Sequence, residues 1–429
     1  MKESWDATGR GPVRRRSRLA AGLVAGTLAA AALFAGCGSD ANDGGSAGSG
    51  GGDADGPYRV YASLSLSGPL AAIGIAEQDG LKAAAEVLNA NGGLDGRRVE
   101  LDIADDGSDP TQAVSLLQRK LTGDEKPNLV WPGSTSNVTL ALCPILMQQR
   151  VLALGITASS DIGDLDRCGY NFVMGPTPAD SQGAVAEQMV ELGHRSVAVL
   201  LSNDAYGQAV EKAVEETFPA AGLEITAVEK FAPDALDASP QLRRLRDTDP
   251  DVLFIEGQGA AVGKVLESRQ QLGWTIPVVG GTGFGGSNVA ALVGPDALRD
   301  VVMWQWAVGV TGEEPVPDRF EQTALPAIQR AARGGELRVA ANLYVGGYDA
   351  LMVADAAARA AGSIDADAMR EALRGFSARP PADPQWVMLR AYPYTAEKNF
   401  SGLQPGDFTL ALPRRLDAKG QVPPARAAG

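Results

Sequence analysis

The sequence predicts an α/β protein made of two lobes, each a doubly wound parallel sheet covered by helices. Short β-type runs alternate with segments of helical spacing along most of the 429 residues. Two series of such strand–helix units follow one another, and the second begins near residues 174–176. Hydrophobic residues make up 45% of the chain, enough for a core in two domain-sized units.

The first 36 residues predict a signal peptide, not a part of the fold. Six basic residues precede an apolar run without charge over 19–36, as in a secretory signal. Residues 33–37, Leu-Phe-Ala-Gly-Cys, resemble the lipobox of bacterial lipoproteins, in which the cysteine is lipidated and becomes the mature N-terminus. We therefore expect Cys37 to be lipidated. The alternative is an ordinary signal peptide with an incidental cysteine.

Residues 37–56 predict a lipidated cysteine followed by a flexible tether. From 38 to 56 the chain contains only Gly, Ser, Ala, Asn and Asp, with no large apolar group. Such a segment cannot bury enough surface to order itself. We expect the folded body to be held close to the outer face of the cytoplasmic membrane, or in the periplasm, through the lipid on Cys37.

Composition disfavours several classes of function. The net charge is −14 with no long basic run, which argues against nucleic-acid binding. The chain has one histidine, so histidine-rich metal sites are excluded and a histidine-dependent triad would need His194. Its three cysteines form no Cys-x-x-Cys pair. We expect no cofactor, no metal and no catalytic residues.

The first series predicts three strand–helix units and a further strand. The helix over 74–91 ends at Asn91-Gly92-Gly93, a C-cap signal, and the helix over 110–121 begins after Asp109 with Pro110 at its first turn. The expected strands are 59–66, 99–104, 128–131 and 151–154, and the expected helices are 74–91, 110–121 and 136–148.

The second series predicts another lobe of similar size. Its expected helices are 181–192, 207–218, 241–247 and 260–272, and its expected strands are 196–201, 223–230, 252–256 and 277–280. Two further helices, near 319–332 and 342–361, have no strands of their own, so we expect them to return and cover the first sheet. Loops at the carboxyl ends of the strands would then face one another across a ligand cleft.

Several motifs, in this order and spacing, resemble the type I periplasmic binding proteins of the branched-chain amino acid class, which deliver solutes to ABC transporters. The resemblance covers residues 58–412 and rests on Leu66–Pro69, Asn89–Arg97, Asp105-Asp106, Asp109–Ala113, Asp204–Gly207, Pro250–Leu253 and Tyr348–Ala350. It implies a hinge of three crossovers, near 175, 304–306 and 377–384. It also implies a first lobe over 57–175 plus 306–380 and a second over 176–305 plus 381–429.

The resemblance implies ligand contacts from two loops of the first lobe. Ser134, Thr135 and Ser136 follow a strand and open a helix, where backbone N–H groups and hydroxyls suit a carboxylate. The alternative is ordinary N-capping. In the loop over 155–160, Thr157 matches a position that binds ligand through its carbonyl and Ser159 one that uses its hydroxyl, with Ala158 between them. The alternative is a polar turn.

The second lobe departs from the family at its most informative position. Tyr206 matches an aromatic ring that lies across the ligand, although packing at a helix start is the alternative, and Gln258 matches a position that is often Tyr. Thr282 stands where relatives use an acid to pair with the ligand ammonium. Because a buried ammonium without a counter-ion is costly, Glu256 would have to substitute for that acid. If Glu256 does not take that role, amides, carboxylates without an amine and aromatic compounds remain possible ligands.

The two remaining cysteines are candidates for a disulfide. Cys143 lies on a helix before a strand and Cys168 lies just beyond that strand, in a chain expected to reach an oxidising compartment. Two buried thiols are the alternative.

Two motifs suggest enzymes but lack the required context. Gly44–Gly48 matches the nucleophile-elbow pattern and lies in the tether. Gly281, Gly283 and Gly286 match a dinucleotide pattern without a clear ribose-binding acid, which leaves a nucleotide-binding enzyme as a remote alternative. We therefore predict a non-enzymatic, monomeric lipoprotein that captures an amino acid, amide or related carboxylate for an ABC permease. A ligand-sensing subunit of a signalling system is the alternative.

Overall fold

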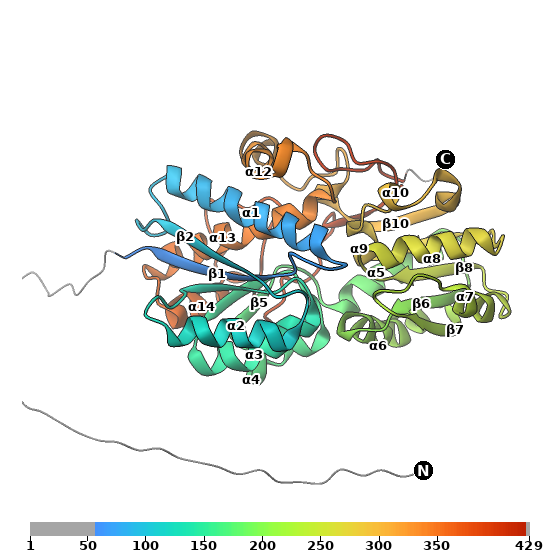
Figure 1. Ribbon diagram of the computed structural model, residues 1–429, viewed down its shortest axis with the longest axis horizontal. Coiled ribbons are helices and arrows are strands. Elements are labelled where there is room, and N and C mark those ends of the chain that lie inside the picture. The colour runs from blue at the N-terminus through green and yellow to red at the C-terminus, as the bar shows by residue number, and fades with distance from the viewer. Residues whose placement is uncertain (1–55, 426–429) are drawn as a thin grey trace, which may run out of the picture. The chain divides into compact units, whose positions relative to one another are not determined.

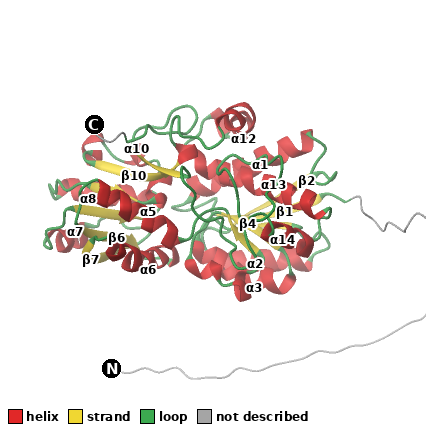
Figure 2. Ribbon diagram, turned by 180° about the vertical axis from the view of Figure 1, so that it is seen from behind, coloured by secondary structure: helices red, strands yellow, loops and turns green. Residues whose placement is uncertain are grey.

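Two sheets organise residues 56–425, the part of the chain that the computed structural model describes (Figure 1). The predicted signal peptide, Cys37 and residues 37–55 of the predicted tether lie outside the described residues. Each sheet is covered by helices, as the view from behind also shows (Figure 2). The predicted class, α/β with two lobes, is confirmed. No helix between 56 and 425 is both long and apolar enough to cross a membrane.

The first sheet is entirely parallel and has the strand order β2-β1-β3-β4-β5. This order makes the sheet doubly wound, because the chain adds strands on both sides of β1. The strands are β1 (Tyr58–Leu64), β2 (Val99–Asp105), β3 (Leu129–Pro132), β4 (Leu152–Gly155) and β5 (Asn171–Val173). The helices of this part are α1 (Ala71–Ala90), α2 (Pro110–Thr122), α3 (Ser136–Gln149) and α4 (Leu165–Cys168).

The second sheet has the order β11-β10-β9-β8-β6-β7 and is parallel except for its edge strand β11. Its strands are β6 (Ser196–Ser202), β7 (Glu224–Phe231), β8 (Val252–Glu256), β9 (Val278–Gly280), β10 (Val301–Trp306) and β11 (Phe408–Ala411). The helices of this part are α5 (Pro178–Glu191), α6 (Ala205–Ala220), α7 (Ser239–Arg246), α8 (Ala260–Gln271), α9 (Thr282–Gly286) and α10 (Val289–Leu292).

The late helices return to the first sheet, as the sequence predicts. They are α11 (Pro317–Arg319), α12 (Leu325–Ala331), α13 (Ala341–Ala361) and α14 (Ala366–Arg374). Helix α13 packs on α1 so closely that only glycine fits at two positions. A Cβ at Gly80 would lie 1.8 Å from the carbonyl oxygen of Tyr344, and a Cβ at Gly347 would lie 2.3 Å from that of Glu77. The backbones of α1 and α13 are therefore in direct contact.

The chain passes between the sheets after β5, after β10 and again before β11. The last passage lies near 400–407, later than the 377–384 that the resemblance implies. The reason is that Trp386, Tyr392 and Tyr394 pack in the core of the first sheet. Buried Asp349 of α13 fastens this segment, since its carboxylate accepts hydrogen bonds from the N–H groups of Val387 and Met388, each at 2.8 Å, and from the Tyr392 hydroxyl at 2.7 Å.

A disulfide joins Cys143 of α3 to Cys168 of α4, as predicted. It closes a loop of 25 residues that contains β4. Closing such a loop stabilises a fold by roughly 3 kcal/mol in the chain-entropy model. The covalent link holds α3, whose first turn contributes to the site described below.

Gly80→Ala should destabilise the protein by about 1–3 kcal/mol, because the new methyl group overlaps the backbone of α13. The matched control is Gly183→Ala, also in a helix, where the nearest atom to the new Cβ is 3.9 Å away. That change should stabilise by up to about 1 kcal/mol through helix propensity. Urea unfolding of both variants measures the difference; equal free energies of unfolding would contradict the close contact between α1 and α13.

Candidate ligand site

A cavity of about 290 Å³ lies where the carboxyl ends of strands from both sheets meet. Loops after β3 and β4 line it from the first lobe, and loops after β6, β8 and β9 line it from the second. Its volume suits one small organic molecule. This arrangement is the one expected at the switch points of parallel sheets.

The loop after β3 contributes the predicted residues Ser134, Thr135 and Ser136, and all three line the cavity. Thr135 is the N-cap of α3, with its hydroxyl oxygen accepting from the N–H of Val138 at 3.3 Å, so the capping interpretation describes that side chain. The Ser134 hydroxyl donates to the carboxylate of Glu77 and accepts from the N–H of Ser65. The first-turn N–H groups of α3 have no partners within the helix and can serve a ligand.

The loop after β4 brings only part of its predicted set to the cavity. Thr157 and Ala158 line it, and the Thr157 hydroxyl shares a 2.7 Å hydrogen bond with that of Thr139. Ser159 is buried and does not line the cavity. A ligand contact by the Ser159 hydroxyl stays a prediction that would require this loop to rearrange.

The second lobe places Tyr206, Gln258 and Thr282 at the cavity. The hydroxyls of Tyr206 and Thr282 lie 3.1 Å apart and share a hydrogen bond. Burial raises the pKa of Tyr206 well above its usual value, with the nearby carboxyl of Glu256 adding to the effect. The phenol therefore stays protonated and can donate.

Glu256 is fully buried and does not line the cavity. One carboxylate oxygen accepts from the N–H groups of Gly257 and Gly283 at 3.0 Å and of Phe284 at 3.2 Å. Burial raises the pKa of Glu256 to about 7, and these hydrogen bonds oppose the rise. The side chain fastens the start of α9 beneath Thr282.

Several polar residues of the cavity were not predicted from the sequence, and three of them are almost completely buried. Glu77 of α1, Gln182 of α5 and Asn342 of α13 all line it, and each is less than 5% exposed. The side-chain oxygens of Gln182 and Asn342 have no hydrogen-bond partner among the described residues. A signal for Glu77 was available: it occupies the buried stripe of α1 with Ile73, Leu81 and Ala84, where a carboxylate is out of place.

The remaining walls of the cavity are apolar and aromatic. Trp306 and Phe408 both line it, and their rings pack with centroids 4.1 Å apart. Ile156 and Leu343 add aliphatic surface. A ligand with an apolar portion would therefore bury that portion against these side chains.

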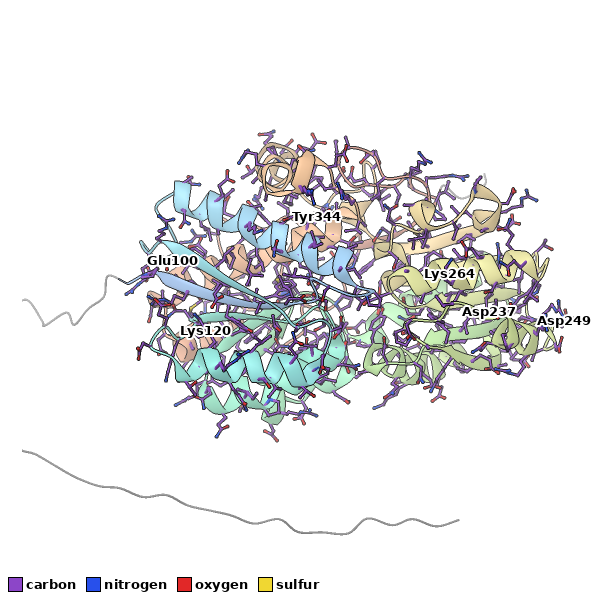
Figure 3. All side chains as sticks on the ribbon, in the orientation of Figure 1. Glu100, Lys120, Asp237, Asp249, Lys264 and Tyr344 are labelled. Atoms are coloured by element: carbon purple, nitrogen blue, oxygen red, sulfur yellow. A yellow bond between two sulfur atoms is a disulfide. The ribbon has the colours of Figure 1, made fainter. Side chains whose placement is uncertain are left out.

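Charged side chains are sparse in the cavity and abundant outside it. Figure 3 shows Glu100 and Lys120 on the outer parts of the first lobe and Asp249 at the outer end of the second. Among the residues described, the only acidic or basic residues that line the cavity are Glu77 and Asp204, and both are acidic. Across the cleft, Asn137 of α3 accepts a 3.0 Å hydrogen bond from the N–H of Ala205 in α6, so the two lobes are in contact.

The chain is similar to proteins that bind solutes outside the cytoplasm. A family model described as periplasmic binding protein matches residues 57–387. The Leu/Ile/Val-binding protein BraC3 of Rhizobium johnstonii is 29% identical over 240 residues, which cover 55% of this chain and 64% of BraC3, less than two thirds of its length. A leucine-, isoleucine-, valine-, threonine- and alanine-binding protein of Pseudomonas aeruginosa is 25% identical over 327 residues, which cover 75% of this chain and 83% of that protein.

Solved structures share the fold. An extracellular ligand-binding receptor from Rhodopseudomonas palustris HaA2 superposes with a TM-score of 0.73 at 21% identity, covering 86% of this chain and all of that one. The substrate-binding protein LivJ of Streptococcus pneumoniae, in complex with isoleucine, has a TM-score of 0.71 at 20% identity and covers 85% of this chain and 97% of its own. A solute-binding protein of Rhodopseudomonas palustris BisB5, in complex with 3,4-dihydroxybenzoic acid, has a TM-score of 0.66 at 20% identity, with coverages of 83% and 92%.

The buried carboxyl of Glu77 predicts a specific pH dependence of stability. Burial raises its pKa to about 8 in the folded protein, against 4.5 for an unperturbed glutamate. Between these values the folded state holds a proton that the unfolded chain releases, so stability falls as the pH rises from about 5 to 8. In Glu77→Gln, the free energy of unfolding should fall less over this range than in the parent protein.

Chemical denaturation of the ligand-free proteins at several pH values measures this difference. Glu100→Gln, at an exposed position on β2, is the control and should keep the dependence of the parent protein. An unchanged dependence in Glu77→Gln would show that this carboxyl is not protonated in the folded state.

Proposed function

Because this chain belongs to the periplasmic binding protein family, we propose that it captures a small polar organic solute between its lobes and delivers it to an ABC permease. The supporting observation is the cavity at the meeting edges of the two sheets, with few charges, unpartnered polar atoms and an aromatic wall. Such a site binds and orients a molecule. The relatives of this chain described above are named as binding proteins, and we propose no reaction on the ligand.

The ligand we propose is an amino acid, an amide or a related carboxylate. A ligand carboxylate would be held by N–H groups at the start of α3 and by the hydroxyl of Ser136, which lines the cavity beside them. The apolar part of the ligand would lie against Tyr206, Trp306 and Phe408. Ligand contacts by Ser134, Thr157, Ala158, Gln258 and Thr282 belong to the same proposal.

The lobes would capture the ligand by bending at the three segments that connect them. Closure brings the walls of the cavity together and excludes water from the ligand. The hydrogen bond from the N–H of Ala205 to Asn137 joins α6 to α3 across the cavity. A permease would then recognise the closed form.

We propose an extracytoplasmic location with a lipid anchor on Cys37. The Cys143–Cys168 disulfide supports an oxidising compartment. The lipid on Cys37 and the predicted tether would keep the folded body, as a monomer, at the membrane surface, where its permease partner lies.

Thermal unfolding with a panel of solutes tests the proposed function. The panel contains leucine, isoleucine, valine, their amides, the corresponding acids without the amine, and 3,4-dihydroxybenzoate. A member present at a hundredfold excess over its dissociation constant should stabilise the protein by roughly 2.7 kcal/mol.

Ala158→Trp is the matched variant, because Ala158 lines the cavity and an indole there would fill it. This variant should fold and lose the stabilisation by the same solute. Absence of any shift across the panel, or the same shift in Ala158→Trp, would contradict binding in this cavity.

A further inference from the structure

Within the part of the chain that the structure describes, the cavity has acidic side chains and no cationic one to neutralise them. Among residues 56–425, no Lys, Arg or His lines it, whereas Glu77 and Asp204 do. A buried carboxylate without a cation is costly, so each acid needs hydrogen bonds, a proton or a cation from a ligand. The partners of each acid therefore indicate what the cavity is built to bind.

Asp204 already has its partners within the fold. It is the N-cap of α6, where one of its carboxylate oxygens accepts from the N–H of Gly207 at 2.8 Å and from the hydroxyl of Ser202 at 3.0 Å. These hydrogen bonds are those of an ordinary helix cap. Asp204 thus has a structural role without a ligand.

Glu256 also has hydrogen-bond partners within the fold. Three backbone N–H groups around α9 hydrogen-bond to one of its oxygens, and the residue lies behind the cavity wall. Its second oxygen has no hydrogen-bond partner among the described residues, but the residue is fully buried and does not line the cavity. Glu256 is therefore poorly placed to substitute for the acid that Thr282 replaces.

Glu77 differs from both. Its carboxylate accepts a hydrogen bond from the hydroxyl of Ser134, and no salt bridge joins it to a basic residue of the described chain. The charged group that acts on it is another acid, Asp106, which lies after β2. When it loses its proton to pair with a cation from a ligand, the carboxylate offers about four acceptor positions, and the hydroxyl of Ser134 uses one of them.

The neighbourhood of Glu77 complements a zwitterion. Ser134, which orients the carboxylate, directly precedes the N-cap of α3 and the N–H groups of its first turn. Donors for a ligand carboxylate and an acceptor for a ligand ammonium therefore lie on adjacent elements of one lobe. The unpartnered oxygens of Gln182 and Asn342 add two more acceptors at the same cavity.

We propose that Glu77 is the residue that binds the protonated amine of the ligand, so that the first lobe supplies the counter-ion that the second lobe lacks. The proposal rests on the proposed function and deepens it by assigning a zwitterionic, amine-bearing ligand to the cavity. Ser134 acts as a positioning residue, because its hydroxyl fixes the carboxylate. Thr282 and Tyr206 then close the cavity without contributing charge.

Paired ligands test the role of Glu77. Calorimetry of the full mature protein measures leucine against 4-methylpentanoate, isoleucine against 3-methylpentanoate and valine against 3-methylbutanoate, each pair differing by the amine. The parent protein should prefer the amine-bearing partner by about tenfold to a hundredfold, the range of a charged hydrogen bond. In Glu77→Gln the preference should fall to within about threefold, because the amide carries no charge.

The ratio of the two affinities within a pair distinguishes a role of Glu77 in binding the amine from a role in folding. A purely structural role of Glu77 would weaken both members of a pair alike and leave their ratio unchanged. Asp79→Asn is the matched control, since Asp79 is a buried acid on the same helix that does not line the cavity, and its ratio should equal that of the parent. Ser134→Ala removes the orienting hydroxyl and keeps Glu77. It should lower the ratio of the two affinities within each pair, and it replaces Glu77→Gln as the test if that variant does not fold.

Each outcome decides the proposal. Loss of the amine preference in Glu77→Gln and its retention in Asp79→Asn support it. Unchanged preference in Glu77→Gln, loss of preference only in Glu256→Gln, or tighter binding of the acids without an amine would overturn it and leave the proposed function standing. Absence of binding by every compound, including the amides and 3,4-dihydroxybenzoate, would overturn the proposed function and this proposal with it.

Discussion

The backbone contact between α1 and α13 is the constraint on which the site depends. Two glycines, Gly80 and Gly347, let helices that are about 270 residues apart in the chain touch without intervening side chains. This contact places Glu77 of α1 and Asn342 of α13 at one cavity. It also holds Asp349 where it can fasten the segment leading to the last passage between the sheets.

Three buried acids illustrate how surroundings decide what a carboxylate does. Glu77, Glu256 and Asp349 all have pKa values raised by burial, so the shift alone does not distinguish them. Glu256 and Asp349 accept from two or more backbone N–H groups and fasten chain segments. Glu77 has the hydroxyl of Ser134 and faces the cavity. Of these three acids, only Glu77 combines a buried carboxyl group with access to a ligand.

Local sequence patterns predicted most of the fold and part of the site. Alternation of β-type and helical spacing predicted the two series of units, and the spacing of Cys143 and Cys168 was compatible with the observed disulfide. The late passage between the sheets could not be predicted, because it depends on side chains far apart in sequence packing around Asp349. Glu77 was overlooked because its importance comes from Ser134 and α13, which meet α1 only in the folded chain.

A crystal structure of the protein with the tightest-binding amino acid of the panel tests the central claim most directly. We expect one molecule in the cavity, with its amine nitrogen within about 3.2 Å of the Glu77 carboxylate and its carboxylate at the first turn of α3. An amine directed to Thr282 and away from Glu77, or a ligand bound outside the cavity, would contradict it.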